Sequence, residues 1–130
     1  MKKLFISVPM KGRTDEAIRK SITCMKQVAE LMFGEELEVL DSYKEAAQIG
    51  SARISIWYLG ESIELLSQTD YFIGVCNNIG YKGCRIESEI ANSYDIPSKH
   101  IDINDFACFD DINVNKLVHN IPQKTDTNSI

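Results

Sequence analysis

The sequence predicts an α/β fold in which helices cover both faces of a mainly parallel sheet of four to five strands. Short apolar, β-prone runs alternate along the chain with segments whose apolar residues recur every three or four positions. Right-handed crossovers between parallel strands place such helices outside the sheet. The length of 130 residues and the hydrophobic share of 44% suit one domain with its own core.

The first part of the chain predicts a strand followed by a long helix. Residues 4–8 form a short apolar run closed by Pro9, which indicates a buried strand. The hydroxyl of Thr14 can cap free backbone amides, and the two acids that follow it suit the positive end of a helix dipole. The helix is expected to end at Gly34. Its predicted buried stripe consists of Ile18, Ile22, Met25, Val28, Ala29 and Met32.

The middle of the chain predicts a second strand, a second helix and a third strand. Residues 37–41 alternate briefly, as in a strand, whereas residues 42–51 are polar and indicate no particular element. Apolar residues over 54–67 predict a helix, although Gly60 weakens that prediction. Residues 70–76 are apolar and β-prone, so they predict the third strand.

The last part of the chain predicts one more helix and strand in alternation, and then a final helix. A loop over residues 77–82 leads into a helix that is expected to end before Pro97. Residues 100–103 predict a fourth, shorter strand. The final helix is expected to begin at residue 110 or 111 and to run through residue 117.

Together the elements predict a single Rossmann-like or flavodoxin-like three-layer domain over residues 1–122, followed by a polar C-terminal tail at residues 123–130. The formal net charge of −5 argues against binding to duplex nucleic acid or to membranes, because both favour basic surfaces. No segment approaches the length of a membrane span. The four cysteines lack the spacing of a zinc site or a disulfide framework. We therefore expect a cytoplasmic protein with free thiols, no metal and no cofactor.

Glu87 is the most informative residue, because it is a carboxylate near the start of the helix that follows a glycine-bearing loop. At about 100° per residue, it shares one helical face with Ile86, Ile90, Ala91 and Tyr94. Glu89 falls on the opposite face. A buried carboxylate is costly, so Glu87 is expected to have a partner, a raised pKa or a catalytic or ligand-orienting task. The alternative is a structural role, in which Glu87 caps loop amides or pairs with Lys82 or Arg85.

Ligands of parallel sheets bind at the carboxyl ends of the strands, so the loops at that edge are expected to share a site with Glu87. The loop after the first strand carries two cations and a glycine ahead of a helix N-terminus, where free amides and the helix dipole attract anions. It could hold a phosphate or a carboxylate, or it could be a solvated basic turn. The candidate binding residues in this loop are Pro9, Met10, Lys11, Gly12 and Arg13.

Further candidates follow the second and third strands or lie in the middle helix. Asp41 could accept hydrogen bonds from ribose hydroxyls, or it could cap the following turn through its own side chain. Trp57 is expected in the core, whereas Tyr58 could stack on a base or serve packing. Asn77 could hydrogen-bond a ligand or simply form a turn.

Three short motifs occur in a fixed order along the chain. The first strand ends in a proline, and a WYLGESIELL segment precedes a strand headed by aspartate. Gly83, Glu87 and Ala91 follow the spacing Gly-x-x-x-Glu-x-x-x-Ala. Over residues 3–103 the chain resembles the nucleoside 2-deoxyribosyltransferase superfamily, including its nucleotide N-glycosidase relatives and an uncharacterised phage and bacterial branch.

The resemblance implies that Glu87 attacks the anomeric carbon of a sugar, expels the base and leaves a glycosyl-enzyme that another base or water resolves. From their expected proximity, Ser62, Tyr58 and Asp41 could contact the sugar or base. Gly83 joins the candidate substrate-binding residues through its motif. The resemblance also implies a homo-oligomer.

Three positions depart from the family pattern. Phe5 stands where the family has a tyrosine, Ser62 where it has an aspartate in the middle helix, and Tyr81 where it has a loop aspartate. Two functions are therefore expected as alternatives. One is an enzyme that cleaves or exchanges the N-glycosidic bond of a nucleoside or nucleotide. The other is a non-catalytic protein that sequesters or senses a nucleotide, such as a phage protein that captures a host nucleotide signal.

Overall fold

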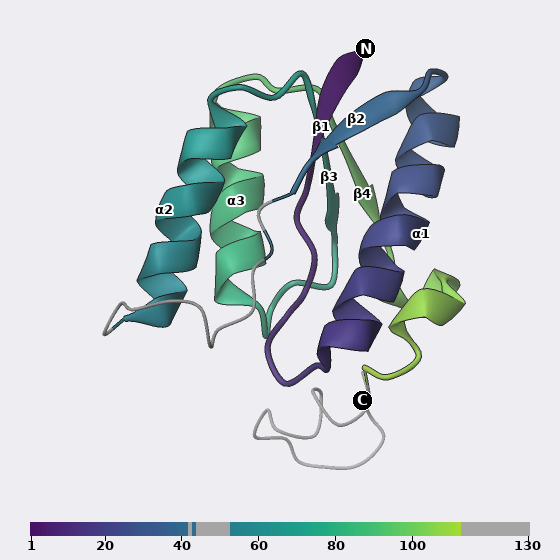
Figure 1. Ribbon diagram of the computed structural model, residues 1–130, viewed down its shortest axis with the longest axis vertical. Helices are drawn as coiled ribbons and strands as arrows, with labels where there is room; N and C mark the ends of the chain where they lie inside the picture. The colour runs from purple at the N-terminus through teal and green to yellow at the C-terminus, as the bar shows by residue number, and fades with distance from the viewer. Residues whose placement is uncertain (42, 44–52, 113–130) are drawn as a thin grey trace.

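The computed structural model describes residues 1–41, 43 and 53–112. These residues form an α/β domain with three layers. A four-stranded, all-parallel sheet lies between α1 on one face and α2 with α3 on the other (Figure 1). The predicted fold class, a single Rossmann-like or flavodoxin-like domain with a parallel sheet, is therefore confirmed.

The elements in chain order are β1 (Lys2–Ile6), α1 (Asp15–Phe33), β2 (Leu37–Leu40), α2 (Ile54–Leu66), β3 (Tyr71–Val75), α3 (Lys82–Ser93), β4 (Ser98–Ile101) and the short 3-10 helices η2 (Ile103–Asp105) and η3 (Ala107–Phe109). The strands lie side by side in the order β2-β1-β3-β4. The chain therefore adds strands first on one side of β1 and then on the other. In sheets of this type, ligands bind at the carboxyl edge near that reversal, which here lies between β1 and β3.

The long helix α1 begins and ends as its sequence predicts. The hydroxyl of Thr14 accepts a hydrogen bond from the Ala17 N–H at 3.1 Å, and Gly34 ends the helix in the left-handed conformation. Most of the predicted stripe contacts the core, but Met32 is 45% exposed, so its predicted burial is wrong. At 3.6 residues per turn, Phe33 takes the last inward position instead. Its ring stacks on the ring of Tyr71, with 4.2 Å between the ring centroids.

Two strands are shifted by two residues from their predicted ranges. The first runs over Lys2–Ile6 rather than 4–8, because its register with β2 already begins at Lys2. The fourth runs over Ser98–Ile101 rather than 100–103, because Ser98 pairs with Phe72 of β3. Local hydrophobic runs do not contain this pairing information.

The predicted final helix is not seen where the structure describes the chain. Residues 107–109 form η3, and residues 110–112 form a turn. The remainder of that prediction, residues 113–117, lies outside the described residues, as does the predicted tail at 123–130. Among the described helices, none combines the length and the apolar character needed to cross a membrane.

Alternation along β1 divides the core between the two faces of the sheet. Leu4, Ile6 and Val8 belong to the cluster that packs against α1, whereas Phe5 belongs to the cluster with α2 and α3. Ser7 follows Ile6 in this alternation, so it faces the same side as Phe5. Candidate residues at the carboxyl edge can therefore contact one another only if they lie on the same face of the sheet.

Candidate functional site

Glu87 lies on the second turn of α3 and points into the molecule beside the reversal point of the sheet. It is only 7% exposed, and it shares the buried face of α3 with Cys84 and Ala91. Glu89 is exposed, as predicted. Tyr94 was also predicted on the inward face, but it is 78% exposed because the helix ends there. The inward orientation of Glu87 is confirmed.

Two serine hydroxyls hold the Glu87 carboxyl. The hydroxyl of Ser7 donates a hydrogen bond to Glu87 Oε1 at 2.6 Å, and Ser62 makes a second side-chain hydrogen bond to the same carboxyl. Ser7 extends β1, since its backbone N–H donates to the carbonyl of Ile73 in β3 at 2.8 Å. Ser62 is buried on the inner face of α2. Three segments that lie far apart in the sequence therefore meet at one carboxyl.

The surroundings of Glu87 change its acidity. Burial raises the pKa of Glu87 above its ordinary value, while the hydrogen bonds from Ser62 and Ser7 act in the opposite direction. Burial and the nearby Glu87 charge also raise the pKa of the Cys84 thiol to about 12. At neutral pH this thiol is protonated, so Cys84 is a poor nucleophile. Glu87, rather than Cys84, is therefore the candidate nucleophile of this cluster.

Phe5 and Ser62, two of the positions at which the sequence departs from the family it resembles, have different surroundings. Phe5 is fully buried, and its ring lies parallel to that of Phe72, with 5.8 Å between the ring centroids. It supplies no hydroxyl to Glu87, but Ser7, two residues later on the same face, does. Ser62, at the position where the resembled family has an aspartate, gives the carboxyl a neutral donor instead of a second negative charge.

Sequence reasoning missed Ser7. The signal that could have identified it is a single hydroxyl inside an apolar, strand-like run, at a position that alternation assigns to the face of α2 and α3. A hydroxyl buried in this way requires a hydrogen-bond partner. Glu87 is that partner.

Arg13 serves the structure of the cationic loop. Its Nε and Nη2 atoms donate to the two carboxylate oxygens of Asp111, both at 2.8 Å, and its side chain is only 2% exposed. The same guanidinium donates to the Pro9 carbonyl at 2.9 Å and to the Ser21 hydroxyl at 2.7 Å. Arg13 therefore fastens the loop and α1 to the segment around Asp111, and its charge is balanced internally.

The other residues of this loop differ in exposure. Pro9 is buried, and Met10 packs partly against the core. Lys11 is exposed, and Gly12 adopts a left-handed conformation with φ of 75°. Of the two cationic side chains in this loop, that of Lys11 is therefore the one exposed to solvent.

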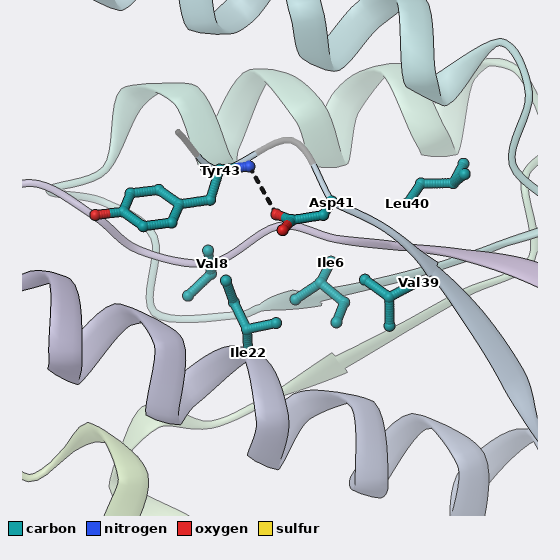
Figure 2. Close-up of a pocket in the computed structure, with 7 residues that line it drawn as sticks. All are labelled: Ile6, Val8, Ile22, Val39, Leu40, Asp41 and Tyr43. Atoms are coloured by element: carbon teal, nitrogen blue, oxygen red, sulfur yellow. Dashed lines mark hydrogen bonds between the residues drawn. The ribbon is translucent and has the colours of Figure 1, made fainter. Parts of the chain in front are cut away.

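Asp41 lies on the other face of the sheet from Glu87. Its Oδ1 accepts a hydrogen bond from the Tyr43 N–H at 3.0 Å, so it caps the following turn, one of its two expected roles. Its Oδ2 lies 3.2 Å from Nη1 of Arg19 in α1. Asp41 and Tyr43 line a small, open hollow together with Ile6, Val8, Ile22, Val39 and Leu40 (Figure 2). Glu87 does not line this hollow.

The remaining candidates have diverse surroundings. Tyr58 is half-buried, and its ring meets that of Trp57 edge-on, with 5.4 Å between the ring centroids. Trp57 was expected in the core, but it is also half-buried. Asn77 accepts a hydrogen bond from the Ile103 N–H at 2.8 Å, so its side chain fastens η2 to the end of β3. Gly83 is exposed on the first turn of α3.

The described residues contain no group of three or more His, Cys, Asp or Glu side chains that could hold a metal ion. The candidate residues fall into two groups. Glu87 and its serine partners lie on one face at the carboxyl edge, and Asp41 lies on the other face. Comparisons of the chain with protein-family models, with curated proteins and with solved structures find no match.

Proposed function

We propose that this protein cleaves or exchanges the N-glycosidic bond of a nucleoside or nucleotide, with Glu87 as the nucleophile. One observation carries the proposal. A buried carboxyl lies at the reversal point of a parallel sheet, and hydroxyls from two other segments fix its position. Such preorganisation is what a group needs if it is to stabilise positive charge that develops on a sugar ring.

The proposed reaction begins with ionised Glu87. A carboxylate oxygen forms a bond to the anomeric carbon while the bond from that carbon to the base nitrogen breaks, and the base leaves with the electron pair and takes a proton from water. Water, or a second base, then attacks the same carbon, loses a proton to solvent and releases the Glu87 carboxylate. Ser7 and Ser62 orient the carboxyl and favour its ionised form, which opposes the effect of burial.

The substrate contacts belong to the same proposal. We assign a phosphate contact, for a nucleotide substrate, to Lys11 rather than to Arg13, because Arg13 is bound to Asp111. Tyr58 and Gly83 are retained as candidate contacts to the base or sugar. Self-association into a homo-oligomer and a cytoplasmic location are further parts of the proposal, and analytical ultracentrifugation tests the former.

Mass spectrometry of small molecules tests the proposed reaction. The protein is incubated with nucleosides and 5′-nucleotides, with and without an added free base. Free or exchanged base is expected with the wild type and with Glu89→Gln, whose carboxyl is exposed on the same helix, but not with Glu87→Gln. A 2-fluoro-2-deoxy sugar substrate should leave an adduct on Glu87. An adduct on another residue, or equal turnover by Glu87→Gln, would contradict the assignment.

A second candidate function is non-catalytic binding of a nucleotide. The observation that favours it is the neutrality of the surroundings. Among the residues that the structure describes, the groups that influence the Glu87 carboxyl are two serines and no second acid. A retaining glycosidase uses a second carboxyl to protonate the leaving group. In this case, mass spectrometry would recover intact ligand bound to both the wild type and Glu87→Gln.

A further inference from the structure

Two cysteines that are far apart in the sequence lie together beside the loop that Arg13 fastens. Cys24 is on α1, and Cys108 is in the middle of η3. The Cys24 thiol lies close enough to the Cys108 thiol to interact with it. Cys108 is buried in the core cluster that packs against α1, and Cys24 packs partly buried against the same cluster.

The backbone around Cys108 is held firmly against α1. The hydroxyl of Ser21 donates to the Cys108 carbonyl at 2.8 Å, and Nη2 of Arg13 donates to the same carbonyl at 3.3 Å. Ser21 precedes Cys24 by three positions, so the two residues lie on the same face of the helix. These contacts hold the Cys108 backbone against the face of α1 that carries Cys24.

We propose that Cys24 and Cys108 form a reactive thiol pair that a low-molecular-weight disulfide, such as glutathione disulfide, converts to an intramolecular disulfide. This inference is independent of the function proposed for Glu87. Although structural disulfides are rare in a reducing compartment, transient, redox-sensing ones do occur there. The cross-link would join η3 covalently to α1 next to the pair formed by Arg13 and Asp111.

The different exposures of the two thiols indicate the order of the steps. The Cys24 thiol loses its proton and its thiolate attacks one sulfur of glutathione disulfide, which forms a mixed disulfide and releases one glutathione thiolate. The Cys108 thiol then loses its proton and attacks the Cys24 sulfur, which releases the second glutathione. Two protein thiols are oxidised, and one disulfide is reduced to two thiols. Each departing glutathione thiolate takes up a proton.

Cys108 is suited to the second step and not to the first. Burial and the neighbouring Cys24 raise the pKa of Cys108 to about 12, so very little thiolate is present at neutral pH. Its contact with Cys24 compensates for this low fraction, because the second step is intramolecular. The other two cysteines have different surroundings. Cys76 is exposed at the end of β3, and Cys84 is buried beside Glu87.

Peptide mapping of the oxidised full-length protein tests the proposal. After treatment with glutathione disulfide and digestion with trypsin under non-reducing conditions, residues 21–26 are expected to be linked to residues 100–116. The intact protein should lose two hydrogens relative to the reduced form. It should also gain a melting temperature higher by about 5 °C, because the disulfide closes a long loop, and dithiothreitol should reverse the gain.

Matched variants separate the pair from the other thiols. Cys24→Ser is expected to lose both the linked peptides and the rise in melting temperature, whereas Cys76→Ser is expected to keep both. If oxidation of the wild type gives only glutathione adducts, a link between two chains, or a link that involves Cys76 or Cys84, the proposal is wrong. The wild-type map decides between these outcomes even if Cys24→Ser folds poorly.

Discussion

The carboxyls of Glu87 and Asp41 occupy the same edge of the sheet but opposite faces, and their chemistry differs accordingly. Glu87 is buried and bonded to neutral hydroxyls, and its pKa is raised. Asp41 has a side chain that is 52% exposed, and it faces the guanidinium of Arg19. Solvent strongly screens the exposed ion pair of Asp41 and Arg19, but it hardly screens the buried interactions of Glu87. Of the two carboxyls, only Glu87 therefore has the buried, hydrogen-bonded surroundings on which the proposed reaction rests.

This comparison separates two requirements for a site in a parallel sheet. Being at the carboxyl edge places a residue near the other strand ends. Strand alternation then decides which face it shares. In the extended segment that follows β1, it directs Ser7 to one face and Val8 to the other. Residues at one edge form a common site only when both conditions are met.

The largest expected difference between the two carboxyls is catalytic. Glu87→Gln should lower the rate of base release by about 1000-fold or more, because the nucleophile is removed. Asp41→Asn should change that rate less than about 10-fold. Liquid chromatography of released base under single-turnover conditions measures both. A larger loss for Asp41→Asn than for Glu87→Gln would reverse the roles assigned to the two faces.

A smaller effect is expected from Ser7→Ala. Loss of the 2.6 Å hydrogen bond should slow base release by about 10- to 100-fold, since each donor to a charged group contributes about 1.5–3 kcal/mol. It should also move the acidic limb of the rate profile to higher pH, because that bond lowers the pKa of Glu87. The pH dependence of kcat is the measurement. Ser7→Thr retains a hydroxyl and serves as the control; a slow variant with an unmoved limb would indicate a general loss of structure.

Individual residues show which features of the fold and of the candidate site can be predicted from the sequence. The ends of α1 and the inward aim of Glu87 were predictable, because capping and helical periodicity are local properties. The partner of Arg13 was not, because Asp111 lies 98 positions away and only tertiary packing brings them together. For the same reason, the sequence placed the cationic loop, Asp41 and Glu87 in one site, whereas the structure turns Arg13 inward and Asp41 to the other face.

The two acidic partners of arginines offer a comparison of stability. Asp111→Asn leaves Arg13 buried without its counter-charge and should lower the free energy of unfolding by about 2 kcal/mol, less than for a fully buried pair because Asp111 is 36% exposed. Asp41→Asn should cost only about 0.5 kcal/mol, because its ion pair with Arg19 is exposed. Urea unfolding followed by circular dichroism measures both values. Equal losses would show that the Arg13 contacts other than Asp111 suffice to hold the loop.

The smallest expected effect is the pH dependence of stability that Glu87 confers. Because burial raises its pKa in the folded state, the folded protein retains a proton on Glu87 over a pH range in which the unfolded chain has lost it. The contribution of Glu87 to stability is therefore present below the ordinary glutamate pKa and is lost as pH rises through the raised one. Glu87→Gln has no such proton to lose, so its stability relative to the wild type should increase over that pH range. Urea midpoints at closely spaced pH values measure the difference. A constant difference between the wild type and Glu87→Gln would mean that the folded state does not hold this proton more tightly than the unfolded chain.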